Sequence, residues 1–291
     1  MGIAEQLHID SSMKKASVFI SDGNHLAAIQ IYKKLLEEKE AERIATIKLA
    51  DIYDQLGKGD AAIKLFNSYL EKNGTDEEVI RLVSFYMLRN SMFEEAFKLV
   101  DKYQHINDEN MDYIRSLLYF HTKQFEIAHI YFDNYLAKYD SSEFIPNVYL
   151  YLAKTYMIFS EYDEALASVK KSIEHSDNIP EQYKIEAEIY YYKEMYYHAG
   201  ESIRKAVKMN PTIIEWRHLQ IRILLMLGEL SKAELNLEET VDNTHSSAEL
   251  LTLLGHSYLK GEKIDSARNY FEKALKINPE YKEAMNGLNL C

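Results

Sequence analysis

Residues 248–281 read AELLTLLGHSYLKGEKIDSARNYFEKALKINPEY, and this stretch decides the fold. It holds two runs in which apolar residues recur every three or four positions, the spacing that places side chains on one face of a helix. Gly261-Glu262 separates the two runs, and Pro279 closes the second. The stretch therefore predicts a helical hairpin, two helices joined by a short turn.

The same pattern recurs along the whole chain. Twelve residues before a periodic alanine stands a residue that is small in seven of eight units, and three residues after that one stands a large residue. A small side chain lets a second helix approach closely, and the large neighbours fill the gaps. The sequence thus predicts eight hairpins of about 34 residues. The periodic alanines are separated by 34, 34, 32, 37, 34, 34 and 34 residues, and they are Ala28, Ala62, Ala96, Ala128, Ala165, Ala199, Ala233 and Ala267.

This pattern resembles the tetratricopeptide repeat family. The eighth unit matches the family pattern best, with Leu254, Gly255 and Tyr258 in the first helix, Ala267, Phe271 and Ala274 in the second, and Pro279 at the end. The sixth unit follows, with Ala187, Tyr190, Ala199, Ala206 and Pro211. The first three units and the seventh lack the closing proline, and in the fourth Pro146 comes late. The resemblance implies an all-α, right-handed superhelical solenoid whose concave wall is lined by the first helix of each unit.

We expect a single solenoid over residues 1–291, capped by a short C-terminal helix at 282–291 that shields the last apolar face. The residues before Ile9 are too few to form a domain. The expected repeats are approximately 9–42, 43–76, 77–108, 109–145, 146–179, 180–213, 214–247 and 248–281.

The concave wall is the expected binding surface, because the resemblance places ligands there. Its middle part is mostly apolar, and basic residues, Arg89 among them, flank it. We predict that an amphipathic helix or an extended apolar peptide docks there, with aromatic residues as anchors. For each single side chain, packing against the adjacent repeat is the alternative. The predicted groove residues are Arg81, Phe85, Leu88, Tyr113, Leu117, Phe120, Leu150, Lys154, Met157, Lys184, Tyr191 and Arg222.

Composition and motifs argue against several other functions. The 34 Lys and Arg and 46 Asp and Glu residues give a formal charge of −12, which disfavours nucleic acid and anionic lipid as partners. No phosphate-binding loop, nucleophile elbow or His-Glu-x-x-His motif is present. His218 and His256 fall on the groove face without the spacing of metal ligands. We therefore expect no catalysis, no cofactor and no metal.

The expected compartment is the cytoplasm, since the first residues show no signal peptide and Cys291 is the single cysteine. A periplasmic protein with its leader removed would look identical. No apolar run of 18 residues occurs, so we expect no membrane insertion. The leading hypothesis is a scaffold that binds a protein or peptide partner. A peptide-responsive regulator and a substrate-recruiting accessory subunit of an enzyme are alternatives, and self-association stays open.

Overall fold

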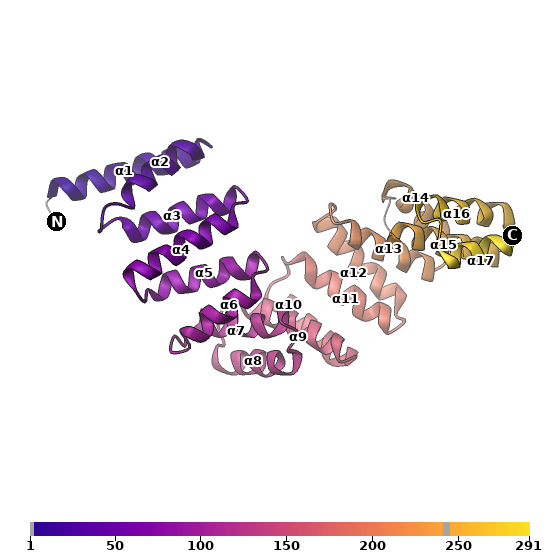
Figure 1. The fold of residues 1–291 in the computed structure, drawn as a ribbon. Coiled ribbons are helices and arrows are strands. Elements are labelled where there is room, and N and C mark those ends of the chain that lie inside the picture. The colour runs from indigo at the N-terminus through magenta and orange to yellow at the C-terminus, as the bar shows by residue number, and fades with distance from the viewer. Residues whose placement is uncertain (1–2, 241–244) are drawn as a thin grey trace. The chain divides into compact units, whose positions relative to one another are not determined.

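The structure, a computed structural model, describes residues 3–240 and 245–291. These residues form helices and no strand, which confirms the all-α prediction (Figure 1). Sixteen of the helices pair in chain order into eight hairpins, and a seventeenth follows them. The hairpins are α1 (Ile3–Ser21) with α2 (His25–Leu35), α3 (Glu42–Gln55) with α4 (Gly59–Asn73), α5 (Glu77–Arg89) with α6 (Phe93–Lys102), α7 (Glu109–His121) with α8 (Phe125–Lys138), α9 (Ile145–Ile158) with α10 (Tyr162–His175), α11 (Pro180–Tyr192) with α12 (Tyr196–Met209), α13 (Ile214–Met226) with α14 (Leu230–Thr240), and α15 (His245–Lys260) with α16 (Ile264–Ile277); α17 is Lys282–Asn289.

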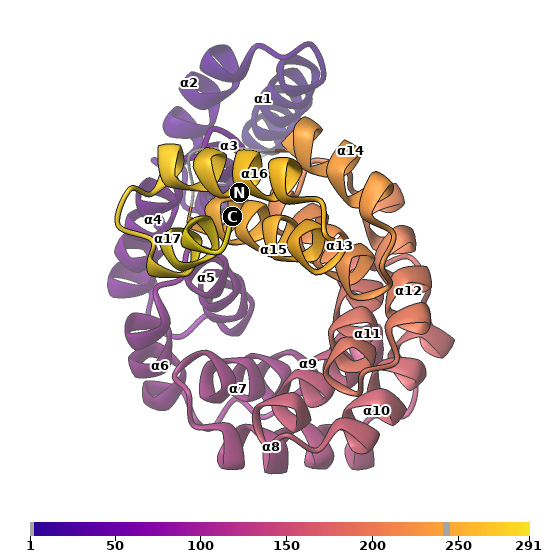
Figure 2. The ribbon, with the colours of Figure 1, turned by 90° about the vertical axis from the view of Figure 1, so that its right-hand side faces the viewer.

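The chain divides into two compact units, Met1–Tyr139 and Asp140–Cys291. The first unit holds the hairpins from α1 to α8, and the second holds those from α9 to α16 together with α17. In each unit the first helices of the hairpins lie along one side of the stack and the second helices along the other (Figure 2). We call the side made by the first helices the first-helix face. A single solenoid over the whole chain stays a prediction.

The ends of the array differ in detail from the expected repeats. Helix α1 covers Ile3–Ser21, so it includes six residues that precede the expected first repeat, and no Gly or Pro lies within it. At the other end α17 lies within residues 282–291 and follows Pro279 directly after a short turn. Its Ala284 is buried against the last hairpin, which covers an apolar face that would otherwise meet water.

The periodic small residues lie where two helices of a hairpin approach closely. All eight periodic alanines are buried, as are the small residues of the first helices. In the last hairpin Phe271 of α16 packs against Gly255 of α15, and it also packs against Gly287 of α17. A Cβ on Gly255 would lie 2.7 Å from a carbon of that ring. The small positions of the sequence are therefore packing positions, as the hairpin prediction requires.

Each hairpin turn contains one residue with a left-handed backbone at the same position. The amide that follows it donates to a carbonyl five residues back, as from Gln124 N to Tyr119 O at 2.9 Å, which ends the first helix with a Schellman motif. Glycine serves three turns, but five use a residue with a side chain, a feature that the sequence analysis did not predict. The left-handed residues are Gly23, Gly57, Ser91, Lys123, Ser160, Glu194, Gly228 and Glu262.

Candidate protein-binding surface

In the first unit, α5 and α7 carry an aromatic cluster on the first-helix face. Phe85 of α5 and Phe120 of α7 are half-buried, as is Leu88 one turn after Phe85. The Phe85 ring lies 6.4 Å from the Tyr113 ring, centre to centre, and Phe120 packs edge-on against Phe125 at 5.5 Å. Such contacts hold the rings in place while part of each remains open to solvent. The contact of Phe85 with Tyr113 thus joins predicted residues of α5 and α7.

Three predicted groove residues lie in the core instead of on the surface. Tyr113 is 6% exposed, Leu117 8% and Leu150 only 1%. Tyr113 also contacts Tyr135 of α8, with ring centres 6.0 Å apart, and Leu150 belongs to the core shared by α9, α10 and α11. Tyr113 packs between Phe85 of the preceding hairpin and Tyr135 of its own, and Leu150 packs against its own hairpin and α11. We therefore correct the apolar patch: these three side chains support the surface without forming it.

In the second unit, the predicted residues lie on α9, α11 and α13. Met157 and Tyr191 are half-buried, and Tyr191 packs against Tyr196 at 5.7 Å between ring centres. Partial burial raises the pKa of the Tyr191 phenol, so this group is neutral at physiological pH. Lys154 lies over the ring of Tyr151, with Nζ 4.4 Å from its centre.

Every predicted groove cation is paired with a carboxylate of the chain itself. Arg81 binds Asp108 and Glu77, and Arg89 binds Asp54. Lys154 Nζ lies 2.9 Å from Glu181, Lys184 Nζ lies 2.8 Å from Glu188, and Arg222 lies 3.0 Å from Glu249. Because each cation has a carboxylate partner, a ligand carboxylate would have to compete with that partner. These cations therefore connect parts of the chain to one another, and they are not open binding sites for an anion.

One of these pairs, Arg81 with Asp108, joins one hairpin to the next through a helix cap, and Arg43 with Asp76 does the same one hairpin earlier. Asp76 caps α5 by accepting from Val79 N at 3.2 Å, and it also accepts from Arg43 Nε at 2.7 Å and from Tyr69 Oη at 3.0 Å. Burial by itself would raise the pKa of Asp76, but these hydrogen bonds outweigh it and hold the pKa below its ordinary value. Asp108 caps α7 through Met111 N and accepts from Arg81 in the same way. An Asp directly before Glu77 or Glu109 is the sequence signal that could have predicted these caps.

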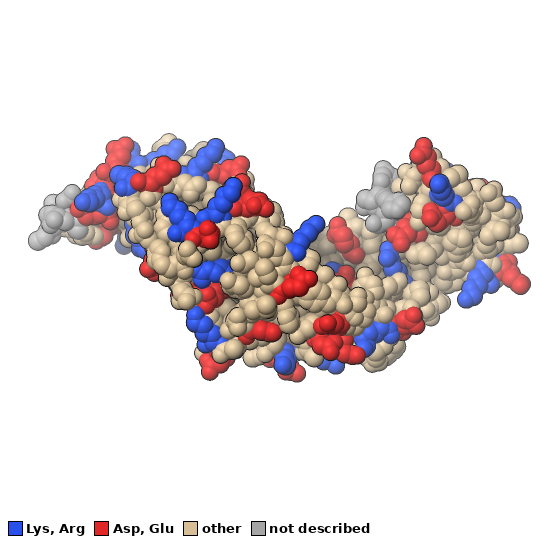
Figure 3. All heavy atoms as spheres, turned by 60° about the horizontal axis from the view of Figure 1, so that its bottom comes forward, with Lys and Arg blue, Asp and Glu red and all other residues tan. Residues whose placement is uncertain are grey.

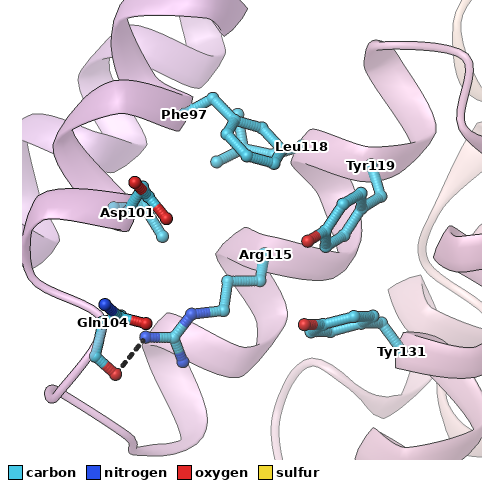
Figure 4. Close-up of a pocket in the computed structure, with 8 residues that line it drawn as sticks. Phe97, Asp101, Gln104, Arg115, Leu118, Tyr119 and Tyr131 are labelled. Carbon is cyan, nitrogen blue, oxygen red and sulfur yellow. Dashed lines mark hydrogen bonds between the residues drawn. The ribbon is translucent and has the colours of Figure 1, made fainter.

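A cavity of about 160 Å³ opens between α6, α7 and α8 in the first unit. Figure 4 shows the rings of Tyr119 and Tyr131 on one side of it and Asp101 on the other, with the Arg115 guanidinium between. Arg115 donates to the backbone carbonyls of Gln104 at 3.2 Å and Ile106 at 2.7 Å, so it fixes the loop after α6. None of the residues that line this cavity is a predicted groove residue.

Charge is mixed over the surface. On the face shown in Figure 3, Lys and Arg are scattered among Asp and Glu, with uncharged areas between them, and they form no continuous basic track. Among the helices of residues 3–240 and 245–291, none is long and apolar enough to cross a membrane. The same residues contain no group of three or more His, Cys, Asp or Glu side chains placed to hold a metal ion.

Comparison with known families identifies two segments. Residues 19–84 match one tetratricopeptide repeat model, and residues 248–281 match another. The second segment is the eighth hairpin, α15 with α16, whose sequence matches the family pattern best. No protein of curated function matches the chain in sequence.

Solved structures give a broader match to the fold. A tetratricopeptide repeat protein from Parabacteroides merdae is 15% identical, with a TM-score of 0.54 over 89% of this chain and 98% of its own. The C-terminal part of a repeat protein from Cytophaga hutchinsonii is 16% identical, with a TM-score of 0.59 over 83% and 98%. YrrB, described as a repeat protein with an unusual peptide-binding site, is 16% identical, with a TM-score of 0.53 over 77% and 97%. These likenesses support the stacked-hairpin fold.

Proposed function

Because the chain belongs to the tetratricopeptide repeat family, we propose that it binds a peptide or helix of a partner protein on its first-helix face. The fold supports a general role as a protein–protein interaction scaffold, and proteins of this family are generally not enzymes. The finer proposal concerns which face binds and what it binds.

The observation that carries the proposal is the aromatic cluster on α5 and α7. Phe85 and Phe120 come from consecutive first helices and remain partly open to solvent, although each is held by a neighbouring ring. Rigid aromatic side chains contribute much of the binding energy at protein interfaces, since they bury a large area at little entropic cost. Leu88 extends the apolar area along α5. An apolar anchor of the partner fits this cluster.

Electrostatics makes a different contribution from the one that the sequence suggested. Arg81 forms ion pairs with Asp108 and Glu77, so it adds hydrogen-bonding groups beside the aromatic cluster but little net positive charge. Lys154, Lys184 and Arg222 are paired in the same way in the second unit, next to Met157 and Tyr191. Binding at these places therefore depends on apolar contact first and on charge second. YrrB, which shares the fold, is itself described as having a peptide-binding site.

The test is a pull-down of partners with Phe85→Glu combined with Phe120→Glu. The matched control replaces Ile127 and Ile130 of α8 by Glu, because both side chains are exposed apolar residues on a second helix of the same unit. We expect loss of partner recovery only with the first pair. Circular dichroism checks that both variants keep the helical content of the parent. Equal recovery by parent and both variants would overturn the proposal.

A further inference from the structure

Three exposed apolar residues occupy the same position in consecutive hairpins of the second unit. Ile158, Tyr192 and Met226 are the last residues of α9, α11 and α13, and each lies 34 residues after the one before. Their exposed fractions are 47%, 57% and 49%. We call these three residues the terminal row. In the first unit the corresponding positions hold polar residues, namely Ser21, Gln55, Arg89 and His121.

Tyr192, the middle residue of the terminal row, is held by a residue beside the preceding turn. Tyr192 stacks on Tyr162, the first residue of α10, with ring centres 5.5 Å apart and planes 14° apart. Met195, in the turn after α11, adds a further exposed apolar side chain. The equivalent stack in the first unit joins Phe93 to His121. The last residue of a first helix thus stacks on the first residue of the preceding second helix in both units. That last residue is Tyr192 in the second unit and His121 in the first.

Acidic residues are frequent in the turns that follow the terminal row, above all after Ile158 and Tyr192. The turns and first residues of the second helices carry five acidic residues against two lysines, Lys193 and Lys232. Both lysines already form ion pairs with two of these acidic residues: Lys193 with Asp163, and Lys232 with Glu229. The side chains of the other three form no ion pair in the part of the chain that the structure describes, and all three residues are exposed. These three unpaired carboxylates are Glu161, Glu164 and Glu194.

The spacing of the row indicates the form of its ligand. Directly packed helices lie about 8–10 Å apart, which is the separation expected between Ile158 on α9 and Tyr192 on α11. In a helical ligand, residues seven positions apart lie on the same face and are separated by about 10.5 Å, at 1.5 Å per residue. An extended strand repeats a face at roughly 6.6 Å, which does not match. A helix with apolar residues at intervals of seven therefore fits the row better than a strand.

We propose that the terminal row binds a basic amphipathic helix of another protein. Its apolar stripe covers Ile158, Tyr192 and Met226, and its Lys and Arg residues face the unpaired carboxylates. A second copy of this chain is a poor occupant, because each copy has a formal charge of −12 and like charges would meet. This surface is the rim beside the turns, so the inference goes beyond the binding of a peptide on the first-helix face and does not depend on it.

The probe is a synthetic, fluorescein-labelled 18-residue peptide with Leu at positions 2, 5, 9, 12 and 16 and Lys on the flanking positions. Its affinity is measured by fluorescence anisotropy. We expect Tyr192→Ser combined with Met226→Ser to weaken binding at least tenfold. Ile127→Ser combined with Ile130→Ser removes two exposed apolar residues of the first unit and leaves the affinity unchanged. Equal weakening by both pairs, or by neither, would overturn the proposal.

Charge is tested with a second matched pair of variants. Glu161→Lys combined with Glu194→Lys reverses two carboxylates at the row, whereas Glu37→Lys combined with Glu71→Lys makes the same change in net charge on the first unit. Only the first pair should weaken binding and flatten its salt dependence. Equal effects of the two pairs would show non-specific attraction and overturn the assignment. Phe85→Glu with Phe120→Glu should leave the affinity for the probe unchanged, so this test and that of the first-helix face fail separately.

Discussion

Asp108 joins two consecutive hairpins through one carboxylate, because it accepts from Arg81 Nε of α5 at 2.6 Å and from Met111 N of α7 at 3.0 Å. The second bond caps α7, and the first ties that cap to the preceding hairpin. Asp76 does the same between α3 and α5 through Arg43. In a stack where each hairpin touches only its neighbours, such links couple the stability of one repeat to the next.

Replacing Asp108 should remove two interactions at once: the cap of α7 and the ion pair with Arg81. We expect Asp108→Ala to lower the free energy of unfolding by about 1–2 kcal/mol, mostly from the lost cap. Asp108→Asn keeps an oxygen for the cap and should cost less. Asp133→Ala changes an exposed Asp on α8 and should stay within about 0.5 kcal/mol of the parent. Urea denaturation measures all three, and an unchanged Asp108→Ala would contradict the role of the cap.

Left-handed turn residues other than glycine store backbone strain. Lys123 has a φ of 62° between α7 and α8, a conformation that glycine adopts without the Cβ penalty. Lys123→Gly should therefore raise the free energy of unfolding by about 0.5–1 kcal/mol. Lys98→Gly, in the interior of α6, should lower it by about 1 kcal/mol. Thermal unfolding followed by circular dichroism compares the two, and a shift of the same sign in both would contradict the turn geometry.

Position 255 requires glycine because a larger side chain would collide with Phe271, and not because its backbone is left-handed. Gly255→Ala places a methyl group against the buried ring of Phe271, so we expect a loss of about 1–3 kcal/mol although Ala favours helix. Gly200 of α12 is the control, because a Cβ there would meet only Leu227 Cδ1 at 3.6 Å and Ile223 Cγ2 at 3.7 Å, ordinary contacts. Gly200→Ala should stabilise the protein by about 0.5–1 kcal/mol. If both variants were stabilised, the close packing of Phe271 would be wrong.

Tyrosine ionisation should set the stability at alkaline pH. Burial, with a smaller contribution from Glu181, raises the pKa of Tyr151 to about 12, whereas the phenol of an unfolded chain ionises near pH 10. The folded state therefore favours the neutral phenol. Its contribution is fully present below pH 10 and is lost as the pH rises from about 10 to 12. Urea midpoints across this range should fall less steeply for Tyr151→Phe than for the parent, and parallel curves would contradict the shift.

The repeating unit could be predicted from the amino-acid sequence alone. Ala28, Ala62 and their successors mark where helices meet, and a period that can be counted leaves little freedom in how each hairpin folds. The large residues before each turn, such as Tyr119, follow from the same period and accept the bond that closes the turn. These features are local, since residues within one unit of about 34 residues decide them.

Tertiary structure decided which predicted groove residues form a surface. The repeat period assigns both Phe85 and Leu150 to the predicted groove. In the structure Phe85 is only half-buried, whereas Leu150 is buried in the core of α9, α10 and α11. The pairing of Arg81 with Asp108, and the exposure of Tyr192 beside Tyr162, likewise needed the stacked hairpins. The physical reason is that burial and charge pairing at the edge of a unit depend on the neighbouring hairpin. The internal period of the sequence does not encode how closely that neighbour covers each side chain.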